Sequence, residues 1–578
     1  MKKYQQLILI ELLLGLIIVG SCKNSSSGDK NDSISSDSLI IAEGKKLFNQ
    51  NCSACHQFSQ DGIGPMLGGV TSKLPVEWLH RFIRNPKNVL SSGDKHADSL
   101  FKKYQTVMPA FDFLKNEDID ALIAFINTSK FPRQPEEQDL SAILNPIPEK
   151  IKESNLVVDL REIVQFPPST YDKKPPLTRI TKLTYQPNTN NIFVNDLRGK
   201  LYKLKNGKIS VYLDFSKVRS KFISDPGLAT GFGSFAFHPR FSANGLLYTT
   251  HTELPRSGKS TYAYNDSIPV TLQWVLTEWK VSDQFSDTLT GSSRELLRLN
   301  MVAGAHGMQD ISFNPLSKPG MKDFGLLYIG IGDGASVQLG YPFIPEKSKR
   351  IWGSIFRIDP LGNNSINRQY GIPSDNPYAR DTNQNVKAEI YAYGFRNPHR
   401  LAWTKSGQML TSHIGQANIE AIDLVEPGHN YGWPVREGNF LFNPYGNLNN
   451  IYPLPENDSK YNITYPVAEF DHDEGNAISG GYEYMGNGIP ELKDKFLFGD
   501  IPHGRLFYIN ARNIKQGKQA IIKEWFITIN GVPTSLKTLS GSDRVDLHFG
   551  VGPRNELYIL TKADGKVYLV QGATFKNN

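Results

Sequence analysis

Two cysteines and a histidine stand at a spacing that predicts covalent attachment of a haem. Cys52, Cys55 and His56 form a Cys-x-x-Cys-His pattern, in which two thiols can bond the two vinyl groups on one haem edge. The following His56 then supplies an imidazole to the iron. A redox dithiol or half of a zinc site is the alternative, but zinc needs further ligands at matching spacing. We therefore predict haem c on Cys52 and Cys55, with His56 as an axial ligand.

The elements around this motif must hold the haem in place. Residues 44–48 precede the motif and read as part of a helix. A second helix is predicted to begin with Asn116 as its N-cap, followed by Glu117 and Asp118. Its apolar face carries Ile119, Leu122, Ile123 and Ile126. Residues 39–132 resemble a class I cytochrome c, which implies a small all-α domain whose last helix packs across the first.

Met108 is predicted to be the second axial ligand of the haem iron. It stands in a Val-Met-Pro-Ala run, and a soft thioether suits haem iron and raises its potential. The resemblance supports this choice, because the family's methionine commonly lies in such a loop before the last helix. Met66 is the main alternative, but it follows His56 closely, where the family loop usually packs against the proximal side. His80 and His96 are further alternatives.

The N-terminus reads as an export signal. Two lysines precede an apolar stretch over residues 7–19, and the Val-Gly-Ser-Cys run that ends at Cys22 resembles the lipobox of bacterial lipoproteins. The resemblance implies that residues 1–22 are the signal peptide and that Cys22 is lipidated. An uncleaved anchor helix is the alternative, although the stretch is short for a membrane span. Either one tethers the protein to a membrane outside the cytoplasm, which we expect to be the outer membrane at its periplasmic or cell-surface face, with residues 23–38 as a flexible tether.

Length, charge and cysteine content restrict the classes of protein to which this chain can belong. A chain of 578 residues is too long for one ordinary core, so two or more domains are expected. The formal charge of +7 comes from 64 basic and 57 acidic residues without a basic block, so nucleic acid is not an expected partner. Each of the three cysteines already has a specific role, which leaves none for structural disulfides.

A proline-rich linker over residues 133–160 is predicted to lead into a large β domain over residues 161–573. A loose strand-turn-strand repeat recurs in this domain. Its copies begin near Leu183, Phe237, Phe313, Leu401 and Phe549. Irregular repeats of hairpins favour a β-propeller over a large β-sandwich or a β-helix.

Several segments raise this expectation, and taken in order they resemble the glucose/sorbosone dehydrogenase family over about residues 165–570. The segments are 304–307, 326–334, 353–360, 372–377, 393–398, 430–434, 479–482 and 498–500. The resemblance implies a six-bladed propeller that uses pyrroloquinoline quinone (PQQ) and calcium to oxidise aldoses. The predicted chain is therefore multidomain, with a small all-α class I cytochrome c domain followed by an all-β six-bladed propeller.

The resemblance also assigns roles to residues. His306 matches the catalytic histidine, whose neutral imidazole takes the hydroxyl proton of the sugar while hydride leaves for the quinone. Arg396 and Asn397 match the pair that contacts the quinone, where a fixed cation stabilises the charge that develops on reduction. A core histidine and a salt-bridged arginine are the alternative interpretations.

The other positions to which the resemblance assigns a role match the family pattern less closely. Gly415 and Gln416 align with residues whose backbone carbonyls bind calcium, although the family often has proline at the second position. Arg544 is expected to bind a carboxylate of the quinone. Residues 229–234 lack the glutamine that sugar-oxidising members have before the next strand. The 501–504 turn lacks the lysine of some members, and His503 is the substitute that the sequence offers.

Three functions follow. The leading one is a membrane-tethered quinohaemoprotein dehydrogenase that oxidises an aldose or related alcohol with PQQ and reduces its own haem, which passes electrons to a cytochrome or oxidase. The second is a non-catalytic propeller that binds carbohydrate or protein, joined to an electron-transfer cytochrome domain. In the third, the haem domain serves an unrelated redox partner.

Overall fold

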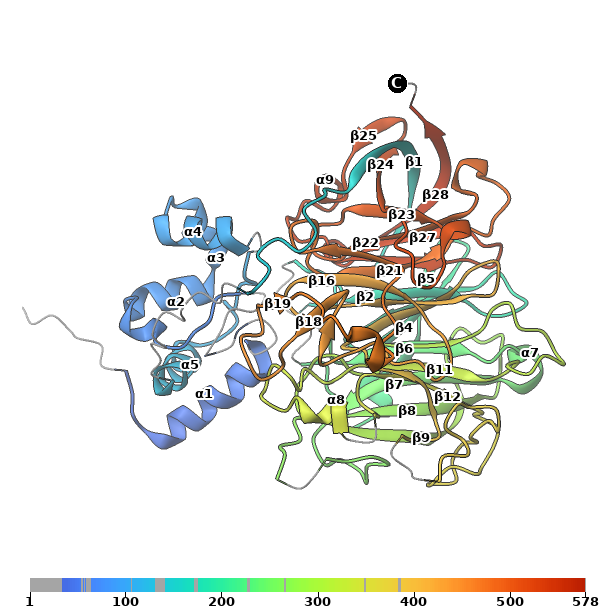
Figure 1. The fold of residues 1–578 in the computed structure, drawn as a ribbon, viewed down its shortest axis with the longest axis horizontal. Helices are drawn as coiled ribbons and strands as arrows, with labels where there is room; N and C mark the ends of the chain where they lie inside the picture. The colour runs from blue at the N-terminus through green and yellow to red at the C-terminus, as the bar shows by residue number, and fades with distance from the viewer. Residues whose placement is uncertain are drawn as a thin grey trace, which may run out of the picture.

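The computed structural model describes residues 34–52, 56, 58, 64–104, 107–129, 141–170, 175–225, 229–264, 267–347, 350–382 and 386–576. In Figure 1, a small helical domain, drawn in blue, lies beside a much larger β domain. Cys22 and Cys55 lie outside the described residues, so the predictions on lipidation and on the second thiol are not addressed. Within the described ranges, no helix has the length and apolar character needed to cross a membrane.

The helical domain is built around two crossing helices, as the resemblance implied. A Cβ on Gly44 would lie 1.8 Å from the carbonyl oxygen of Ala121, so only a glycine lets the first and last helices approach this closely. Ile119 and Leu122 on the last helix are fully buried at the crossing. The helices are α1 (Ser38–Asn51), α2 (Val76–Arg84), α3 (Pro86–Ser91), α4 (Lys95–Tyr104) and α5 (Asn116–Thr128), with a 3-10 turn at Val70–Ser72.

The start of α5 differs by one residue from the prediction. Lys115, not Asn116, is the N-cap, and the Asp118 carboxylate accepts a hydrogen bond from the Lys115 amide at 2.9 Å. The Asn116 side chain cannot cap the helix because its oxygen accepts from Arg84 on α2 at 2.5 Å. The acidic first turn is as predicted, but the Asn116 side chain bonds Arg84 instead of capping the helix.

In the described part of the chain, the β domain contains one 13-stranded sheet, three four-stranded sheets and one three-stranded sheet. The 13-stranded sheet includes three runs of four antiparallel strands, one of them completed by the strand that opens the domain, so the strands can be grouped into six four-stranded units. The first three units are β2 (Ile180–Tyr185), β3 (Ile192–Asp196), β4 (Lys200–Lys205) and β5 (Lys208–Asp214); β6 (Phe232–Phe237), β7 (Leu246–Glu253), β8 (Leu272–Val281) and β9 (Gly291–Met301); and β10 (Asp310–Phe313), β11 (Leu327–Ile331), β12 (Ser354–Ile358) and β13 (Ile390–Tyr393). The other three are β14 (Pro398–Trp403), β15 (Met409–His413), β16 (Ile419–Leu424) and β20 (Ala468–Asp471); β21 (Ile478–Glu483), β22 (Lys495–Asp500), β23 (Leu506–Asn510) and β24 (Lys523–Ile529); and β26 (Leu547–Val551), β27 (Leu557–Thr561), β28 (Lys566–Phe575) and β1 (Lys152–Gln165).

The first strands of the units contact one another in succession. The contacts run from β2 to β6, β10, β14, β21 and β26, and β26 pairs with β2 again. β1 lies between β28, its antiparallel partner, and β24, to which it is parallel. β1 begins at Lys152, inside the range predicted to be linker, because its buried Leu156, Val158 and Leu160 complete the last unit.

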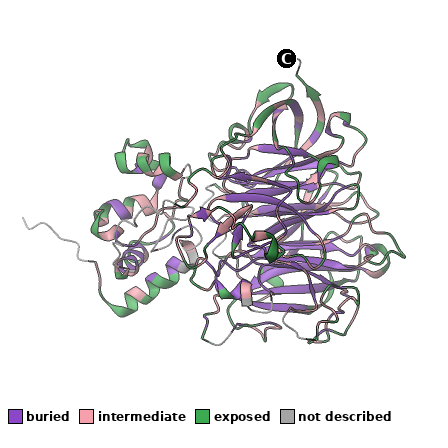
Figure 2. Ribbon diagram, in the orientation of Figure 1, coloured by how far each residue is buried: buried purple, intermediate pink, exposed green. Residues whose placement is uncertain are grey.

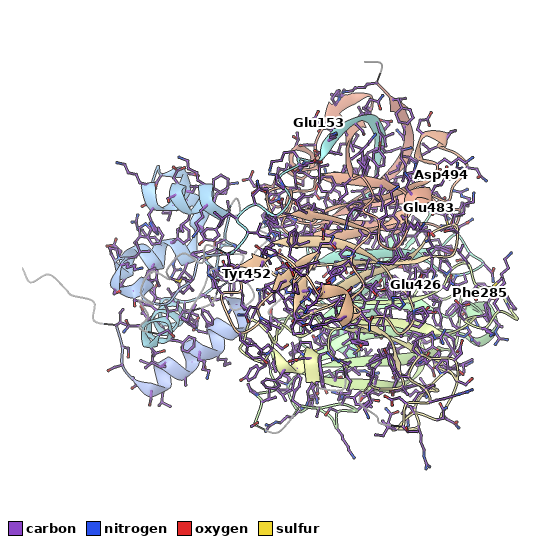
Figure 3. The ribbon with its side chains drawn as sticks, viewed as in Figure 1. Glu153, Phe285, Glu426, Tyr452, Glu483 and Asp494 are labelled. Carbon is purple, nitrogen blue, oxygen red and sulfur yellow. The ribbon has the colours of Figure 1, made fainter. Side chains whose placement is uncertain are left out.

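Shorter elements decorate these sheets. A small sheet of β17 (Arg436–Glu437), β18 (Phe440–Phe442) and β19 (Ile451–Tyr452) is inserted between β16 and β20, and β25 (Val532–Thr534) extends β24. Tyr452 lies on the side of the β domain that faces the helical domain, whereas the exposed Phe285 lies on the far side (Figure 3). The short helices are α6 (Phe215–Val218), α7 (Phe241–Asn244), α8 (Phe343–Lys347) and α9 (Leu536–Ser540), and further 3-10 turns lie at Asp458–Tyr461, Pro490–Leu492 and Ala511–Asn513.

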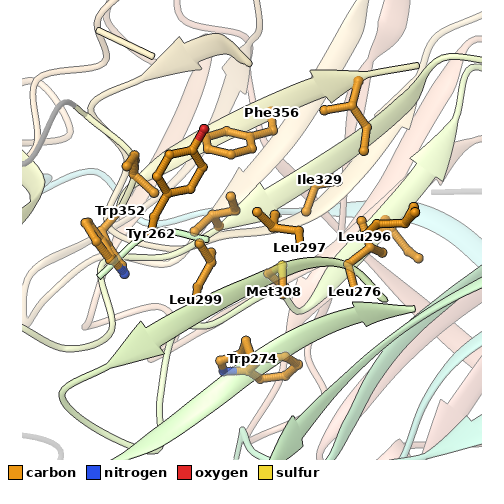
Figure 4. Close-up of a cluster of buried hydrophobic side chains, with 14 of the residues drawn as sticks. Tyr262, Trp274, Leu276, Leu296, Leu297, Leu299, Met308, Ile329, Trp352 and Phe356 are labelled. Atoms are coloured by element: carbon orange, nitrogen blue, oxygen red, sulfur yellow. The ribbon is translucent and has the colours of Figure 1, made fainter. Parts of the chain in front are cut away.

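Burial is concentrated in the strands, which are mostly purple in Figure 2, while the outer turns of the helical domain are exposed. Figure 4 shows the cluster between the second and third units, in which Trp274 and Met308 lie among leucines of β8 and β9. The linker is fixed to the β domain, because the Ile143 amide donates to the Ile451 carbonyl at 2.9 Å and the Ile147 amide donates to Asp471 at 3.2 Å.

Candidate active site

The predicted site residues come together at one edge of the β domain. In an antiparallel four-stranded unit, the start of the first strand and the loop between the second and third strands lie at the same end. His306 precedes β10, Arg396 and Asn397 precede β14, and Gly415 and Gln416 lie between β15 and β16. Chain topology thus gathers these five residues from two neighbouring units onto one edge.

His306 is held by a buried carboxylate. Its Nδ1 lies 2.8 Å from Oδ1 of Asp333, two residues after the end of β11. Asp333 also accepts hydrogen bonds from the Ala335 amide at 2.8 Å and from Nε1 of Trp433 at 3.0 Å. Because the carboxylate accepts here, His306 carries its proton on Nδ1 and presents the lone pair of Nε2.

The backbone at His306 is unusual and depends on two glycines. His306 itself has a φ of 49°, in the left-handed region that is costly for a residue with a side chain. A Cβ on Gly307 would lie 1.8 Å from Nε1 of the buried Trp274, and a Cβ on Gly332 would lie 2.4 Å from the His306 carbonyl. The Gly-rich segments flanking the site are therefore needed for close packing rather than for flexibility.

The electrostatics of His306 suit a neutral base. Burial lowers its pKa from the ordinary value of 6.5, the charge of Arg396 lowers it further, and Asp333 opposes both effects. Its side chain is 13% exposed, so a small ligand at the edge can reach Nε2. A neutral imidazole with a fixed tautomer is the form that accepts a proton in general base catalysis.

Arg396 lies beside this pair, and its backbone carbonyl accepts from the Asp333 amide at 2.8 Å. Its guanidinium donates to the Gly415 carbonyl and, at 2.9 Å, to Oε1 of Gln416. Its own amide donates to Nε2 of His413 at 2.8 Å. The residue is 4% exposed, so the cation is fixed at the edge of the site.

The predicted calcium ligands are part of a tightly held turn. One oxygen of Glu437 accepts from the backbone amides of residues 416–419 at 2.7 to 3.0 Å. The Gly415 carbonyl is already paired with Arg396, and a guanidinium and a calcium ion cannot share it. In the described part of the chain, no three or more His, Cys, Asp and Glu side chains cluster in a way that could hold a metal. Calcium stays a prediction, and it requires Arg396 to move.

Several buried polar atoms at this edge lack a hydrogen-bond partner among the described residues. Asn397 donates to Oε1 of Gln309 at 3.1 Å, but its Oδ1 accepts nothing, and Nε2 of Gln416 donates to nothing. Unpaired buried polar groups are costly, so they mark places where a ligand completes the hydrogen bonding.

Arg544 lies in a second, strongly basic part of the same edge. It precedes β26 and its Nε donates to Oδ1 of Asp546 at 2.9 Å. Lys562, in the turn between β27 and β28, and Arg179, before β2, are close enough to help lower the pKa of Asp546. A site that binds a polyanion is expected to have such an excess of cations.

The haem motif is described in part. The His56 side chain is buried, and its Nδ1 lies 2.8 Å from the Pro65 carbonyl, a contact that fits the predicted ligation of iron through Nε2. A Cβ on Gly64 would lie 2.5 Å from the His56 ring, so a glycine is required where the chain passes it. Because the Pro65 carbonyl lies at Nδ1, residues next to it, including Met66, start on the side of the ring opposite to Nε2. Met108, which lies half-buried before α5, stays the predicted second ligand.

Comparison with known proteins decides the family. Residues 177–530 match glucose/sorbosone dehydrogenase, and residues 41–130 match cytochrome c. The chain belongs to the glucose/sorbosone dehydrogenase family. Its N-terminal helical domain is a cytochrome c domain, and both resemblances seen in the sequence are confirmed.

The relatives are distant. HIPL2 protein of Arabidopsis thaliana is 28% identical over 319 residues, which are 47% of this chain and 42% of that protein. Quinoprotein glucose dehydrogenase B of Acinetobacter calcoaceticus is 26% identical over 392 residues, 61% of this chain and 73% of that protein. The chain spans about half the length of the first curated relatives it matches. A crystal structure of glucose dehydrogenase, at 18% identity and a TM-score of 0.51, covers 71% of this chain and 99% of that one, which shows a shared fold.

This member of the glucose/sorbosone dehydrogenase family departs from the expected pattern at two positions. At both, the residue that is present is hydrogen-bonded within the fold. In residues 229–234, Ser234 lies in β6, which is buried throughout; it accepts from Nζ of Lys182 at 3.1 Å and donates to Asp310 at 3.0 Å. His503, the predicted substitute for the missing lysine, has its Nδ1 2.8 Å from the Asp500 carboxylate. Both side chains are therefore engaged within the fold.

Other site residues were not singled out from the sequence. Asp333 and Trp433 lie inside quoted family segments, so pattern alone could have found them. His399, His548 and Lys562 have no motif of their own, and only the folding of the sheets brings them together.

Proposed function

We propose that this chain is a membrane-tethered dehydrogenase that oxidises an aldose or a related alcohol with PQQ and reduces its own haem. The observation that carries the proposal is the buried His306–Asp333 pair beside the Arg396 guanidinium. We further propose that the six units are the blades of a six-bladed propeller, with the site at one mouth of its central channel. The name of the Acinetobacter relative, quinoprotein glucose dehydrogenase, supports this chemistry.

The donor set fits PQQ, which carries three carboxylates and an ortho-quinone. Arg396 and Asn397 would hold the quinone end, and the cations around Arg544 would hold the carboxylates. When bound, PQQ supplies a carbonyl carbon that accepts hydride.

The protein's own residues then have separate tasks. His306 would accept the substrate's hydroxyl proton at Nε2, while Asp333 keeps the imidazole in the required tautomer and stabilises the imidazolium that forms. Arg396 would stabilise the negative charge that develops on the quinone oxygen, from a position that needs little reorganisation. Trp433 fixes the carboxylate from its other side.

The remaining parts of the proposal concern the anchor and the metal. Lipidation of Cys22 would hold the protein at the outer membrane, and the haem would pass electrons to a cytochrome or oxidase. Calcium at the carbonyls of Gly415 and Gln416 requires Arg396 to turn from Gly415, so no step is routed through calcium.

The test is reconstitution of the purified full-length protein with PQQ, with and without Ca²⁺, followed by addition of aldoses and alcohols. Reduction of the haem, read from its visible absorption, is the expected result. PQQ binding and dye reduction without haem reduction would mean that the haem serves another partner. No binding of PQQ would favour the carbohydrate- or protein-binding alternative, which the absence of the family glutamine in residues 229–234 supports.

A further inference from the structure

A group of buried cations lies on the same edge as His306, in the part of the site where the proposed function places the carboxylates of PQQ. Lys562 stands in the turn that follows β27, and its residue is 8% exposed. Arg544 and Asp546 lie directly before β26, and Arg179 lies directly before β2. These two first strands are neighbours, so the three segments meet at one point of the edge.

The charges around Lys562 do not balance. The charged groups that act most strongly on its ammonium are Asp546, Arg179, Arg544 and, from β14, Arg400. Counting Lys562 itself, these are four cations and one carboxylate, and that carboxylate is hydrogen-bonded to Arg544 at 2.9 Å. Arg179 also has Arg198 and Asp196 near it, which leaves the excess of three positive charges unchanged. Burial lowers the pKa of Lys562 to about 8; Asp546 opposes this, and the arginines add to it. A buried excess of positive charge destabilises a fold, so it indicates a site for an anion.

Two neutral histidines complete this part of the site. The rings of His399 on β14 and His548 on β26 lie 5.8 Å apart. Burial lowers the pKa of both well below 6.5, so each ring is neutral and has one N–H to donate. Among the described residues, both ring nitrogens of His548 and Nδ1 of His399 lack a hydrogen-bond partner. Both residues are nevertheless buried, His548 at 1% and His399 at 6% exposure.

The strand between the two histidines packs closely against its neighbours at two glycines. β21 separates β14 from β26 and contains Gly480 and Gly481. A Cβ on Gly480 would lie 2.3 Å from Cβ of Arg400. The same cluster reaches the catalytic residues, since His399 lies within electrostatic range of both Lys562 and His306.

We propose that Lys562, with His399 and His548 beside it, binds carboxylates of PQQ. The inference rests on the proposed function and names a residue that the family pattern does not supply. Three carboxylates match the excess of three positive charges, and unpaired imidazole N–H groups match carboxylate oxygens. The cation that is missing from the 501–504 turn is thus provided by the turn between β27 and β28.

The test is equilibrium binding of PQQ to the full-length protein, measured by titration calorimetry over a range of pH. A bound carboxylate raises the pKa of Lys562 above its free value of about 8, so affinity should fall about tenfold from pH ~7 to pH ~9. Lys562→Met should weaken binding about 10- to 100-fold near pH ~7 and remove that pH dependence. PQQ trimethyl ester, which lacks the charges, should bind both proteins equally.

A second readout separates ligand binding from a structural role. Without PQQ, Lys562→Met should raise the unfolding temperature of the β domain, because it removes one of the mutually repelling cations. Lys566→Met is the matched control at the start of β28, directly after the same turn. Lys566 pairs with Glu162 at 3.1 Å, so its loss should affect neither PQQ binding nor its pH dependence.

The outcomes are distinct. If the wild-type protein does not bind PQQ, the proposed function is overturned and this inference with it. If the wild-type protein binds PQQ while Lys562→Met binds it equally well, with the same pH dependence, this inference alone is overturned. A lower unfolding temperature of Lys562→Met without PQQ would likewise contradict the role as an unbalanced ligand cation.

Discussion

Asp333→Asn should slow substrate oxidation far more than it changes cofactor binding. The carboxylate receives three N–H groups, from His306, Ala335 and Trp433. An asparagine offers one oxygen and places its NH₂ against at least one of these donors. The imidazolium that forms during proton transfer also loses its counter-charge at 2.8 Å. At an effective dielectric constant near 20, a pair about 4 Å apart interacts by about 4 kcal/mol, which corresponds to roughly a thousandfold in rate.

The assay is stopped-flow haem reduction at saturating PQQ and sugar, with PQQ affinity measured separately. Because Asp333 raises the pKa of His306, the substitution should also move the acid limb of the rate profile to lower pH. Asp423→Asn is the matched control: Asp423 holds Nδ1 of His413 at 2.9 Å in the same way, but Nε2 of His413 already accepts the Arg396 amide and cannot act as a base. Rates for Asp333→Asn within tenfold of wild type, at unchanged PQQ affinity, would refute the reasoning.

Three further outcomes are expected. Met108→Ala should abolish the weak absorption band of iron–thioether bonding in the oxidised haem domain, whereas Met66→Ala should keep it; the reverse result would exchange the ligands. Cys22→Ser should leave the protein unprocessed or free of the membrane fraction, and unchanged mass with unchanged membrane retention would count against lipidation. Gly307→Ala should lower the thermal stability of the β domain and disable the site, because its Cβ would meet Trp274 at 1.8 Å. Gly207→Ala, at a φ of 74° with open space around it, is the control and should cost only about 1 kcal/mol.

Local patterns predicted much of the β domain. The five repeat copies correspond to the first hairpins of five units, for example Phe313 paired with Leu327 and Phe549 paired with Ile559. The sixth hairpin, β21 and β22, was not recognised as a copy, because glycines replace the apolar residues at the middle of β21. A Cβ on Gly480 would lie 2.3 Å from Cβ of Arg400 and one on Gly481 would lie 1.3 Å from the Leu497 carbonyl oxygen, so close packing requires both glycines.

Local sequence patterns could not predict pairings between strands that lie far apart along the chain. Leu160 of β1 pairs with Val570 of β28, so the strand that completes the last unit precedes it by almost the whole domain. The same limit applies to the site: His306, Arg396 and Asn397 lie in recognisable segments, but Lys562 becomes meaningful only when its turn is placed beside Arg179 and Arg544. A single buried lysine in a polar turn has no sequence signal that separates it from a solvated one.

The linker gives a physical reason for joining a haem to this fold. Ile143 and Ile147 pack against the cluster that contains Trp433, Phe442 and Ile451. Trp433 in turn donates to Asp333, which holds His306. The linker to the haem domain is therefore fixed on the side of the β domain that contains the site, not on the opposite edge. Because electron tunnelling weakens steeply with distance, attachment at this point keeps the haem domain near the place where the proposed reaction releases electrons.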